Sequence, residues 1–165
     1  MKTVILCRHA KSSWDDPNLS DIDRPLNDRG LRDSTFMGNI LKEKEIMPDL
    51  IISSPAVRAF STAKFYAKAL GYLLDNILIE NSVYEGGAKG IIELLEKIDE
   101  NSNTVLVFGH NPDMTHLAAL FSGIRIDNIP TSGIVCIDFD CKNWAKITNK
   151  KGKIRFLEYP KKYLK

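Results

Sequence analysis

The chain has 165 residues, of which 44% are hydrophobic and 27% are charged, and its formal net charge is +2. This length is sufficient for one domain with a hydrophobic core, and the composition excludes disordered and collagen-like chains. No apolar run approaches the roughly 18 residues that a transmembrane helix needs, so we expect a single domain over residues 1–165, cytoplasmic and without a membrane partner.

Short runs rich in Ile, Val and Leu recur along the chain and predict buried strands. They do not alternate between apolar and polar residues, which is typical of parallel strands covered on both faces. The first run begins like a signal peptide, but its apolar stretch stops at Arg8 and no small-residue cleavage site follows. The runs occupy residues 3–7, 50–52, 77–79 and 104–108.

Amphipathic stretches between these runs predict helices. Leu31, Ile40 and Leu41 share one face of a helix expected over residues 30–46, which ends before Pro48. The alternation of strands and helices predicts an α/β fold, a three-layer α/β/α sandwich around a mostly parallel sheet. Apolar residues repeat at helical spacing in three further stretches, residues 56–70, 91–98 and 117–121.

The C-terminal part of the chain predicts further strands at the edge of the sheet. Residues 134–139, 145–148 and 154–159 have the composition of two or three strands with turns between them, which indicates a hairpin. The region is also basic, since residues 142–165 contain nine Lys or Arg and one acid, Glu158. No series of aromatic residues accompanies these cations, so we interpret them as a solvated surface and expect no nucleic-acid partner.

Arginine and histidine follow three of the predicted strands at the points where the strands end. Arg8 and His9 follow the first strand, Arg58 comes shortly after the second, and His110 follows the fourth. Because parallel strands point their carboxyl ends to one edge of a sheet, we expect these side chains to converge. Two arginines and two histidines at one place suit a tetrahedral dianion such as phosphate.

Two of these strand ends are expected to lead directly into helices. Ser54 suits an N-cap and Pro55 suits the first helical position, which places Arg58 in the first turn. Asn111 and Pro112 repeat this arrangement after the fourth strand. The two helix amino termini would add positive potential at the same place.

Each of these residues has an ordinary structural interpretation when it is taken alone. A single arginine usually lies at the surface or in a salt bridge, and a single histidine beside a buried strand is usually a structural one. The repetition at equivalent strand ends favours an anion site over these interpretations.

Four segments in chain order resemble the histidine phosphatase (phosphoglycerate mutase-like) superfamily, and within it the small SixA-type phosphohistidine phosphatases. The resemblance implies the phosphoglycerate mutase-like fold without a helical cap, because the chain has no room for the helical insertions of the mutases. The segments are RHAKSSW (residues 8–14), RPLNDRG (24–30), SSPAVRA (53–59) and GHNP (109–112).

The resemblance implies roles for individual residues. His9 would be the catalytic nucleophile, and Arg8, Arg58 and His110 would hold the phosphoryl oxygens. The acid that larger relatives carry after the third strand would fall on Glu85, which we consider equally as a proton donor and as an exposed loop carboxylate.

The sequence also departs from the mutase pattern. Ala10 and Lys11 stand where the mutases have Gly and an acid or amide, and Asp15 stands where they have Asn. An ionised Asp15 cannot donate a hydrogen bond to phosphate, so we assign it no phosphate-binding role.

The expected chemistry follows from the residue types. A neutral imidazole nitrogen of His9 would attack phosphorus in line, and water would then hydrolyse the phosphohistidine intermediate. The flanking cations would keep His9 neutral and stabilise the charge on the equatorial oxygens. We therefore expect no cofactor and no metal.

The sequence thus predicts a metal-independent phosphatase that acts on protein-borne phosphohistidine or on small phosphate monoesters. The alternative that we keep is a non-catalytic module that binds phosphate or a phosphorylated protein. In both cases the expected partner is a phosphorylated protein or a small phosphate ester, and we expect a monomer.

Other hydrolase classes fit less well. A cysteine phosphatase requires Cys-x₅-Arg, but Ser13 stands six residues after Cys7. The three cysteines form no Cys-x-x-Cys pair, which argues against a zinc ribbon and a disulfide framework. A metal site built on His9, His110 and His116 would lack a carboxylate cluster.

Overall fold

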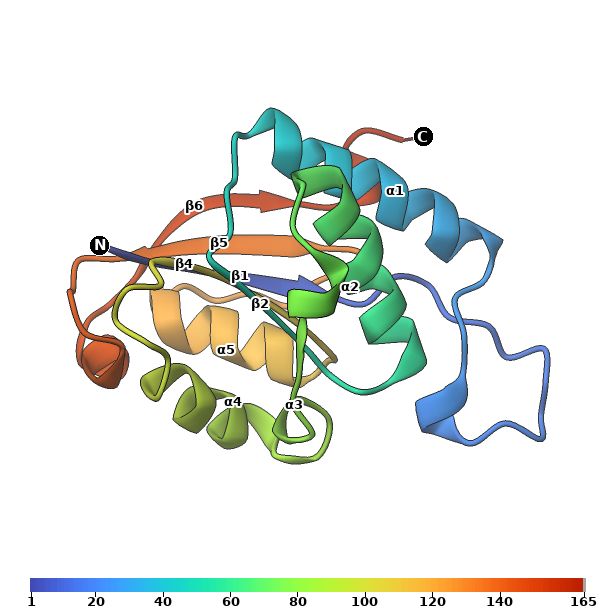
Figure 1. Cartoon of the computed structure of the whole chain (residues 1–165), viewed down its shortest axis with the longest axis horizontal. Helices are drawn as coiled ribbons and strands as arrows, with labels where there is room; N and C mark the ends of the chain where they lie inside the picture. Colours follow the sequence, from blue (N-terminus) through green and yellow to red (C-terminus); the bar gives the residue numbers. More distant parts are fainter. Residues whose placement is uncertain (165) are drawn as a thin grey trace.

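The computed structural model describes residues 1–164, which form a six-stranded sheet between two layers of helices (Figure 1). The strand order is β3-β2-β4-β1-β5-β6, with β1 to β4 parallel and both β1–β5 and β5–β6 antiparallel. The predicted three-layer α/β/α fold with a mostly parallel sheet is confirmed. The strands are β1 (Lys2–Arg8), β2 (Leu50–Ser53), β3 (Leu78–Ile79), β4 (Thr104–Gly109), β5 (Ile134–Phe139) and β6 (Lys153–Glu158).

Helices cover both faces of the sheet, with α1 and α2 on one face and α4 and α5 on the other (Figure 1). Among residues 1–164, no helix combines the length and the apolar character needed to cross a membrane. The α-helices are α1 (Asp28–Glu43), α2 (Val57–Leu70), α3 (Ser82–Glu85), α4 (Gly87–Glu96) and α5 (Asp113–Ser122), and the 3₁₀ helices are η1 (Asp21–Asp23), η2 (Leu74–Asn76), η3 (Trp144–Asn149) and η4 (Pro160–Lys162).

Buried residues of the central strands divide between two hydrophobic clusters. Along β1, Val4 and Leu6 face α4 and α5, whereas Ile5 and Cys7 face α1 and α2. All four are fully buried. Successive side chains of a strand point to opposite faces, so a strand buried on both sides is apolar throughout, which explains the continuous apolar run in the sequence.

Of the two or three strands predicted in the C-terminal part, the structure contains two, and the strand over residues 145–148 is absent because this segment belongs to η3. Trp144 and Ile147 are both fully buried, and residues three positions apart lie on the same side of a 3₁₀ helix. The Trp144 indole N–H also donates to the carbonyl oxygen of Ser102 at 2.7 Å. The hairpin is otherwise present as the antiparallel pair β5–β6 at the edge of the sheet.

The start of α2 also differs from the prediction. The helix begins at Val57 with Ala56 in the N-cap position, so Ser54 is not the N-cap and Pro55 is not the first helical residue. The Ser54 hydroxyl oxygen instead accepts the backbone N–H of Ala56 at 3.1 Å within the preceding turn. Arg58 still lies in the first turn of the helix.

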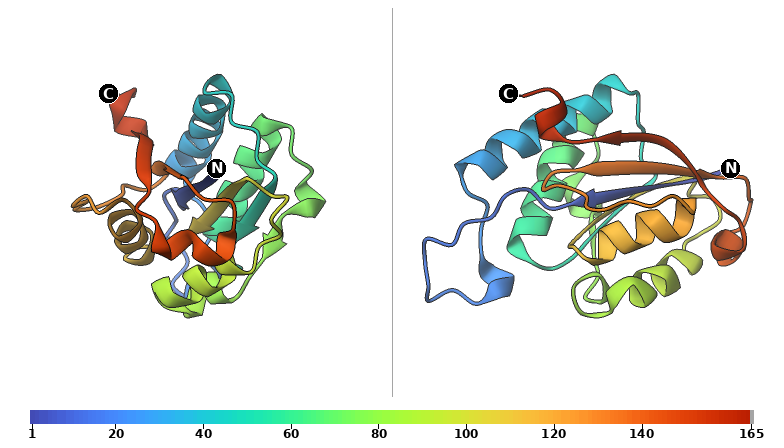
Figure 2. Two further views of the ribbon diagram at one scale, coloured as in Figure 1. Left: turned by 90° about the vertical axis from the view of Figure 1, so that its left-hand side faces the viewer. Right: turned by 180° about the vertical axis from the view of Figure 1, so that it is seen from behind.

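The segment between β1 and α1, residues 9–27, projects beyond the carboxyl edge of the sheet (Figure 2). The segment ends at Asn27, the N-cap of α1, whose side-chain oxygen accepts the backbone N–H of Gly30 at 2.8 Å. A Cβ atom on Gly30 would lie 2.1 Å from the carbonyl oxygen of Lys11. Only glycine therefore allows α1 to approach the segment that follows His9 so closely.

Candidate active site

A pocket of about 260 Å³ lies at the carboxyl edge of the sheet and is lined by side chains from three strand ends. Arg8 ends β1 and His9 follows it, Arg58 comes from the first turn of α2, and His110 follows β4. The ring centroids of the two histidines are 5.2 Å apart. The structure thus brings together four of the five residues that the sequence singled out.

The geometry of the His9 ring identifies the nitrogen that carries the lone pair. Nδ1 lies 2.7 Å from the carbonyl oxygen of Ala10. A carbonyl oxygen can only accept a hydrogen bond, so Nδ1 carries the proton and Nε2 is unprotonated in the neutral ring. Burial, with smaller contributions from His110, Arg58 and Arg8, lowers the pKa of His9 to about 3. The ring is therefore neutral at physiological pH.

The His110 ring is tied to the turn that begins α2. Its Nε2 lies 2.8 Å from the hydroxyl oxygen of Ser54. Its Nδ1 is buried without a hydrogen-bond partner among residues 1–164. Burial and then the Arg58 charge lower the pKa of His110 to about 4, so this ring is also neutral at physiological pH.

The two predicted arginines are anchored through part of each guanidinium group. Arg8 Nη1 donates to the carbonyl oxygen of Ile129 at 2.9 Å. Arg58 donates through Nη1 to the Asp21 carbonyl oxygen at 2.7 Å and through Nη2 to the Asp21 carboxylate at 3.0 Å. The Nε atoms of both arginines are buried and find no acceptor in the described chain. Buried donors normally have partners, so these N–H groups point to an oxyanion as the missing acceptor.

The structure adds a third arginine that the sequence analysis did not assign to the site. Arg24 lines the pocket, donates through Nη2 to the Ser12 hydroxyl at 2.8 Å, and stacks on the exposed Trp14 ring at 3.4 Å. Its Nη1 atom is buried and lacks a hydrogen-bond partner within residues 1–164, and its Nε atom lies 3.5 Å from the Asp21 carboxylate. A bridge between Ser12 and Leu26 folds the loop back so that Arg24 reaches the pocket. The only sequence evidence for Arg24 was its place at the start of the segment RPLNDRG, and this segment does not show that the side chain reaches the pocket.

Asp21 connects the projecting loop to the site. Its carboxylate accepts the Tyr84 hydroxyl at 2.7 Å in addition to the Arg58 guanidinium. The Tyr84 hydroxyl, and then Arg58, hold the pKa of Asp21 below its usual value. The Tyr84 ring in turn packs edge-on against His110 with centroids 5.4 Å apart. Asp21 thus fixes the orientation of Arg58 and joins η1 to α3.

Glu85 lies apart from the other four predicted residues. It is exposed at the end of α3 and does not contribute to the lining of the pocket. Successive residues of a helix point about 100° apart, so the turn that directs Tyr84 toward His110 directs Glu85 away. The structure does not bring Glu85 together with His9.

The residues of the competing sequence interpretations lie elsewhere. Cys7 is fully buried within β1, where burial raises the pKa of its thiol. His116 is exposed on α5, and Asp15 is exposed outside the pocket. Across residues 1–164, no three His, Cys, Asp or Glu side chains are grouped in a way that could hold a metal ion.

Lowering the pH from neutral to about 5 is expected to destabilise the folded protein. His9 and His110 have folded-state pKa values of about 3 and about 4, against an ordinary value of 6.5. Between these values the unfolded chain binds protons that the folded chain excludes, so the free energy of unfolding falls as the pH falls. Each histidine adds up to about 1.4 kcal/mol per pH unit to this slope.

Urea unfolding at several pH values measures the effect. His110→Gln keeps a polar side chain of similar size that cannot titrate. It should therefore reduce the slope of the free energy of unfolding against pH between pH 6.5 and 4. A slope that stays the same in this variant would contradict the assignment of a neutral, buried His110.

Comparison with known sequences places these residues in a family. Residues 4–83 match the model of the histidine phosphatase superfamily (branch 1), a range that includes Arg8, His9, Arg24 and Arg58. An uncharacterised protein of Mycobacterium tuberculosis is 31% identical over 151 residues, which cover 85% of this chain and 90% of that protein. An uncharacterised chloroplastic protein of Arabidopsis thaliana is 35% identical over 133 residues, or 76% of this chain, and the match spans only 61% of the plant protein.

Solved structures with a similar fold match this protein over nearly the whole chain. The SixA protein of Agrobacterium tumefaciens has a TM-score of 0.80 and 26% identity, and the match covers 96% of this chain and 98% of that one. The protein histidine phosphatase SixA in complex with tungstate has a TM-score of 0.83 and 23% identity over 97% of this chain and 98% of that one. The expected SixA-like architecture without a helical cap is therefore confirmed. From the sequence match, the shared fold and the arginine–histidine pocket together, we conclude that the chain belongs to branch 1 of the histidine phosphatase superfamily.

Proposed function

We propose that this protein is a metal-independent phosphatase that hydrolyses protein-borne phosphohistidine or small phosphate monoesters through a covalent phosphohistidine on His9. The observation that carries the proposal is the His9 ring, whose Nδ1–H is donated to Ala10 and whose Nε2 lone pair is free. Buried arginine N–H groups without acceptors in the described chain surround it. The tungstate bound by the structurally similar SixA is a tetrahedral oxyanion of the kind that such donors accommodate.

The reaction consists of two displacements at phosphorus. In the first, His9 Nε2 donates its lone pair to phosphorus while the bond to the leaving group breaks, and the leaving group departs with that electron pair. In the second, water attacks phosphorus, the N–P bond breaks, and its electron pair returns to Nε2. Inorganic phosphate is released and His9 is again neutral.

The arginines supply the electrostatic part of the catalysis. Negative charge is spread over the three equatorial oxygens in the transition state. Arg8, Arg58 and Arg24 each retain buried N–H groups that can donate to these oxygens. Donors fixed before the reaction stabilise such charge without reorganisation, which is why no metal is required in this proposal.

The surroundings of the leaving group favour phosphohistidine over alkyl esters. Protonated imidazole is already a good leaving group, whereas an alkoxide needs a proton from a general acid. The Tyr84 hydroxyl donates to Asp21, and Glu85 lies outside the pocket. A substrate that needs no proton donor from the protein fits this arrangement best.

A side-by-side assay tests the proposal. We expect phosphate release in the presence of a chelator from a phosphohistidine protein, from free phosphoramidates and from an aryl phosphate, with the highest kcat/KM for the phosphohistidine protein. Binding of these compounds without release of phosphate from any of them would support the alternative, a non-catalytic phosphate- or phosphoprotein-binding module.

The same substrates test the role of Glu85. Because Glu85 is exposed and lies outside the pocket, we expect Glu85→Gln to leave both ester and phosphoramidate hydrolysis nearly unchanged. A loss of about a hundredfold on the ester alone would instead identify Glu85 as the proton donor. Glu93→Gln, an exposed residue of α4, is the matched control. Equal rates for the variant and the wild type on both substrates would remove Glu85 from the mechanism.

A further inference from the structure

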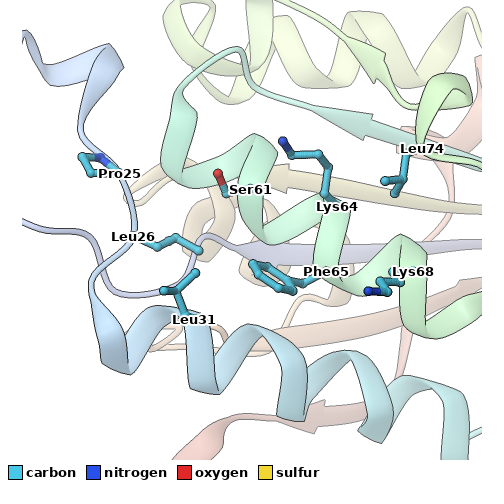
Figure 3. A pocket seen from close by; sticks show the side chains of 8 residues that line it. All are labelled: Pro25, Leu26, Leu31, Ser61, Lys64, Phe65, Lys68 and Leu74. Atoms are coloured by element: carbon cyan, nitrogen blue, oxygen red, sulfur yellow. The ribbon is translucent and has the colours of Figure 1, made fainter.

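A second cavity, of about 330 Å³, lies beside the catalytic pocket between the start of α1, the face of α2 and η2 (Figure 3). We call it the α1–α2 groove. Apolar side chains form much of its lining, and two lysines of α2 stand along it. The residues that matter here are Leu26, Leu31, Phe65 and Leu74, together with Lys64 and Lys68.

Helix α2 contributes residues to both the groove and the catalytic pocket. Arg58 lies in the pocket, and Ser61, Phe65 and Lys68 follow it at intervals of three, four and three residues. This spacing places all four on one face of the helix. The groove therefore starts one helical turn beyond a phosphate-binding arginine.

The loop before α1 makes a second connection. Arg24 points into the catalytic pocket, whereas Leu26, two residues later, lines the groove. Leu26 also pairs with Ser12, which lines the catalytic pocket. The two cavities thus share one short, bridged segment as a common wall.

The charge of the groove indicates what it can bind. None of its eight lining residues is acidic, and Lys64 and Lys68 are both exposed. Neither lysine forms a salt bridge with any residue from 1 to 164. The Lys64 ammonium group lies over the Phe60 ring at 4.8 Å, so both cations lack a carboxylate partner among residues 1–164. Apolar side chains beside two such cations match a segment that carries aliphatic residues next to carboxylates.

The length of the groove distinguishes a polypeptide from a small ester. Arg58 and Lys68 are ten residues apart on one helix, which is about 15 Å at 1.5 Å per residue. A small phosphate ester held at Arg58 does not reach Lys68. About five residues of extended chain cover this distance.

We propose that the α1–α2 groove is the docking site of the protein substrate, and that it takes an acidic, leucine-rich segment adjacent to the phosphohistidine. This inference rests on the proposed phosphatase function and specifies its substrate as a protein. A leucine side chain lies against Leu26, Leu31 and Phe65, and carboxylates pair with the two lysines.

The probe is a synthetic peptide with one histidine followed by alternating Leu and Glu residues, prepared with and without a phosphoryl group on the histidine. Fluorescence anisotropy of the unphosphorylated peptide measures docking without any turnover. Phosphate release from the phosphorylated peptide and from an aryl phosphate measures catalysis. A failed phosphatase function is thus distinguished from a failed docking site.

We expect Lys64→Glu/Lys68→Glu to weaken peptide binding and kcat/KM for the phosphopeptide about tenfold, and to leave aryl phosphate hydrolysis unchanged. Leu31→Asn should weaken peptide binding without a change in charge. Lys142→Glu/Lys146→Glu is the matched control. These exposed lysines follow β5, which runs antiparallel to β1. They therefore lie near the amino ends of the parallel strands, at the end of the sheet opposite the catalytic pocket.

Equal losses in the two double-lysine variants would overturn the proposal in favour of a general charge effect. Unchanged peptide binding in Lys64→Glu/Lys68→Glu would also overturn it. Dimers in sedimentation that dissociate in Leu31→Asn would assign the groove to a second copy of the chain instead. Loss in the groove variants alone, with a monomeric wild type, supports the proposal.

Discussion

His9→Ala is expected to abolish turnover, with a fall in kcat of about four orders of magnitude or more on every substrate. The reason is that Nε2 of His9 forms the bond to phosphorus in the proposed mechanism, and Nδ1 is already committed to the Ala10 carbonyl oxygen at 2.7 Å. The other histidine of the pocket is held differently, because its Nε2 is engaged by Ser54 at 2.8 Å and its Nδ1 is buried. Steady-state phosphate release measures the loss.

A rapid quench of the wild-type enzyme with labelled substrate gives the complementary result. The trapped phosphoprotein should be labile in acid and stable in base, as a phosphoramidate is, and His9→Ala should trap none. Binding of inorganic phosphate to the variant, measured by calorimetry, checks that the pocket is intact. Recovery of an acid-stable phosphoester from the wild type would contradict the assignment of the nucleophile.

Arg58→Ala is expected to lower kcat/KM by about a thousandfold, the upper range for loss of one fixed donor to developing charge. The change removes the buried Nε donor, and it also leaves the Asp21 carboxylate with only the more distant Arg24 guanidinium, whose Nε lies 3.5 Å away. That carboxylate would then repel a dianionic substrate. The measurement is kcat/KM on an aryl phosphate, with the unfolding midpoint recorded to confirm a folded variant.

Two further variants separate these contributions. Asp21→Asn keeps Arg58 and removes the negative charge, so it should cost much less activity than Arg58→Ala. The double variant Arg58→Ala/Asp21→Asn should recover part of the loss because the repulsion is gone. Arg58→Lys keeps the charge but not the paired contacts to Asp21, so it should stay well below wild type. Wild-type kcat/KM in Arg58→Ala would remove this arginine from the site.

The sequence predicted the framework of the site because its signals are local. The apolar runs at residues 3–7 and 104–108 are strands that are buried on both faces. Burial on both faces requires a nearly continuous run of apolar residues, which is readable in the sequence. The residue that ends a parallel strand must lie at the carboxyl edge of the sheet. Arg8, His9 and His110 could therefore be placed together although about a hundred residues separate them.

Errors and omissions occurred where long-range packing decides the outcome. The segment 145–148 has the composition of a strand, but burial of Trp144 and Ile147 on one side makes it part of η3. The sequence predicts Ser54 as a helix N-cap. In the structure its hydroxyl group instead contacts the backbone N–H of Ala56 and the His110 ring, and the sequence gives no sign of the contact with His110.

By itself, the sequence determined the fold class, the edge of the sheet that carries the chemistry, and the four side chains Arg8, His9, Arg58 and His110 that meet there. Only the tertiary structure decided that Arg24 joins them, that Asp21 holds Arg58, and that Tyr84 rather than Glu85 turns toward the pocket. The physical reason is that strand ends are placed by backbone pairing, which has a readable pattern. The direction of a loop side chain depends instead on contacts with residues far away in the chain, and no local pattern encodes these contacts.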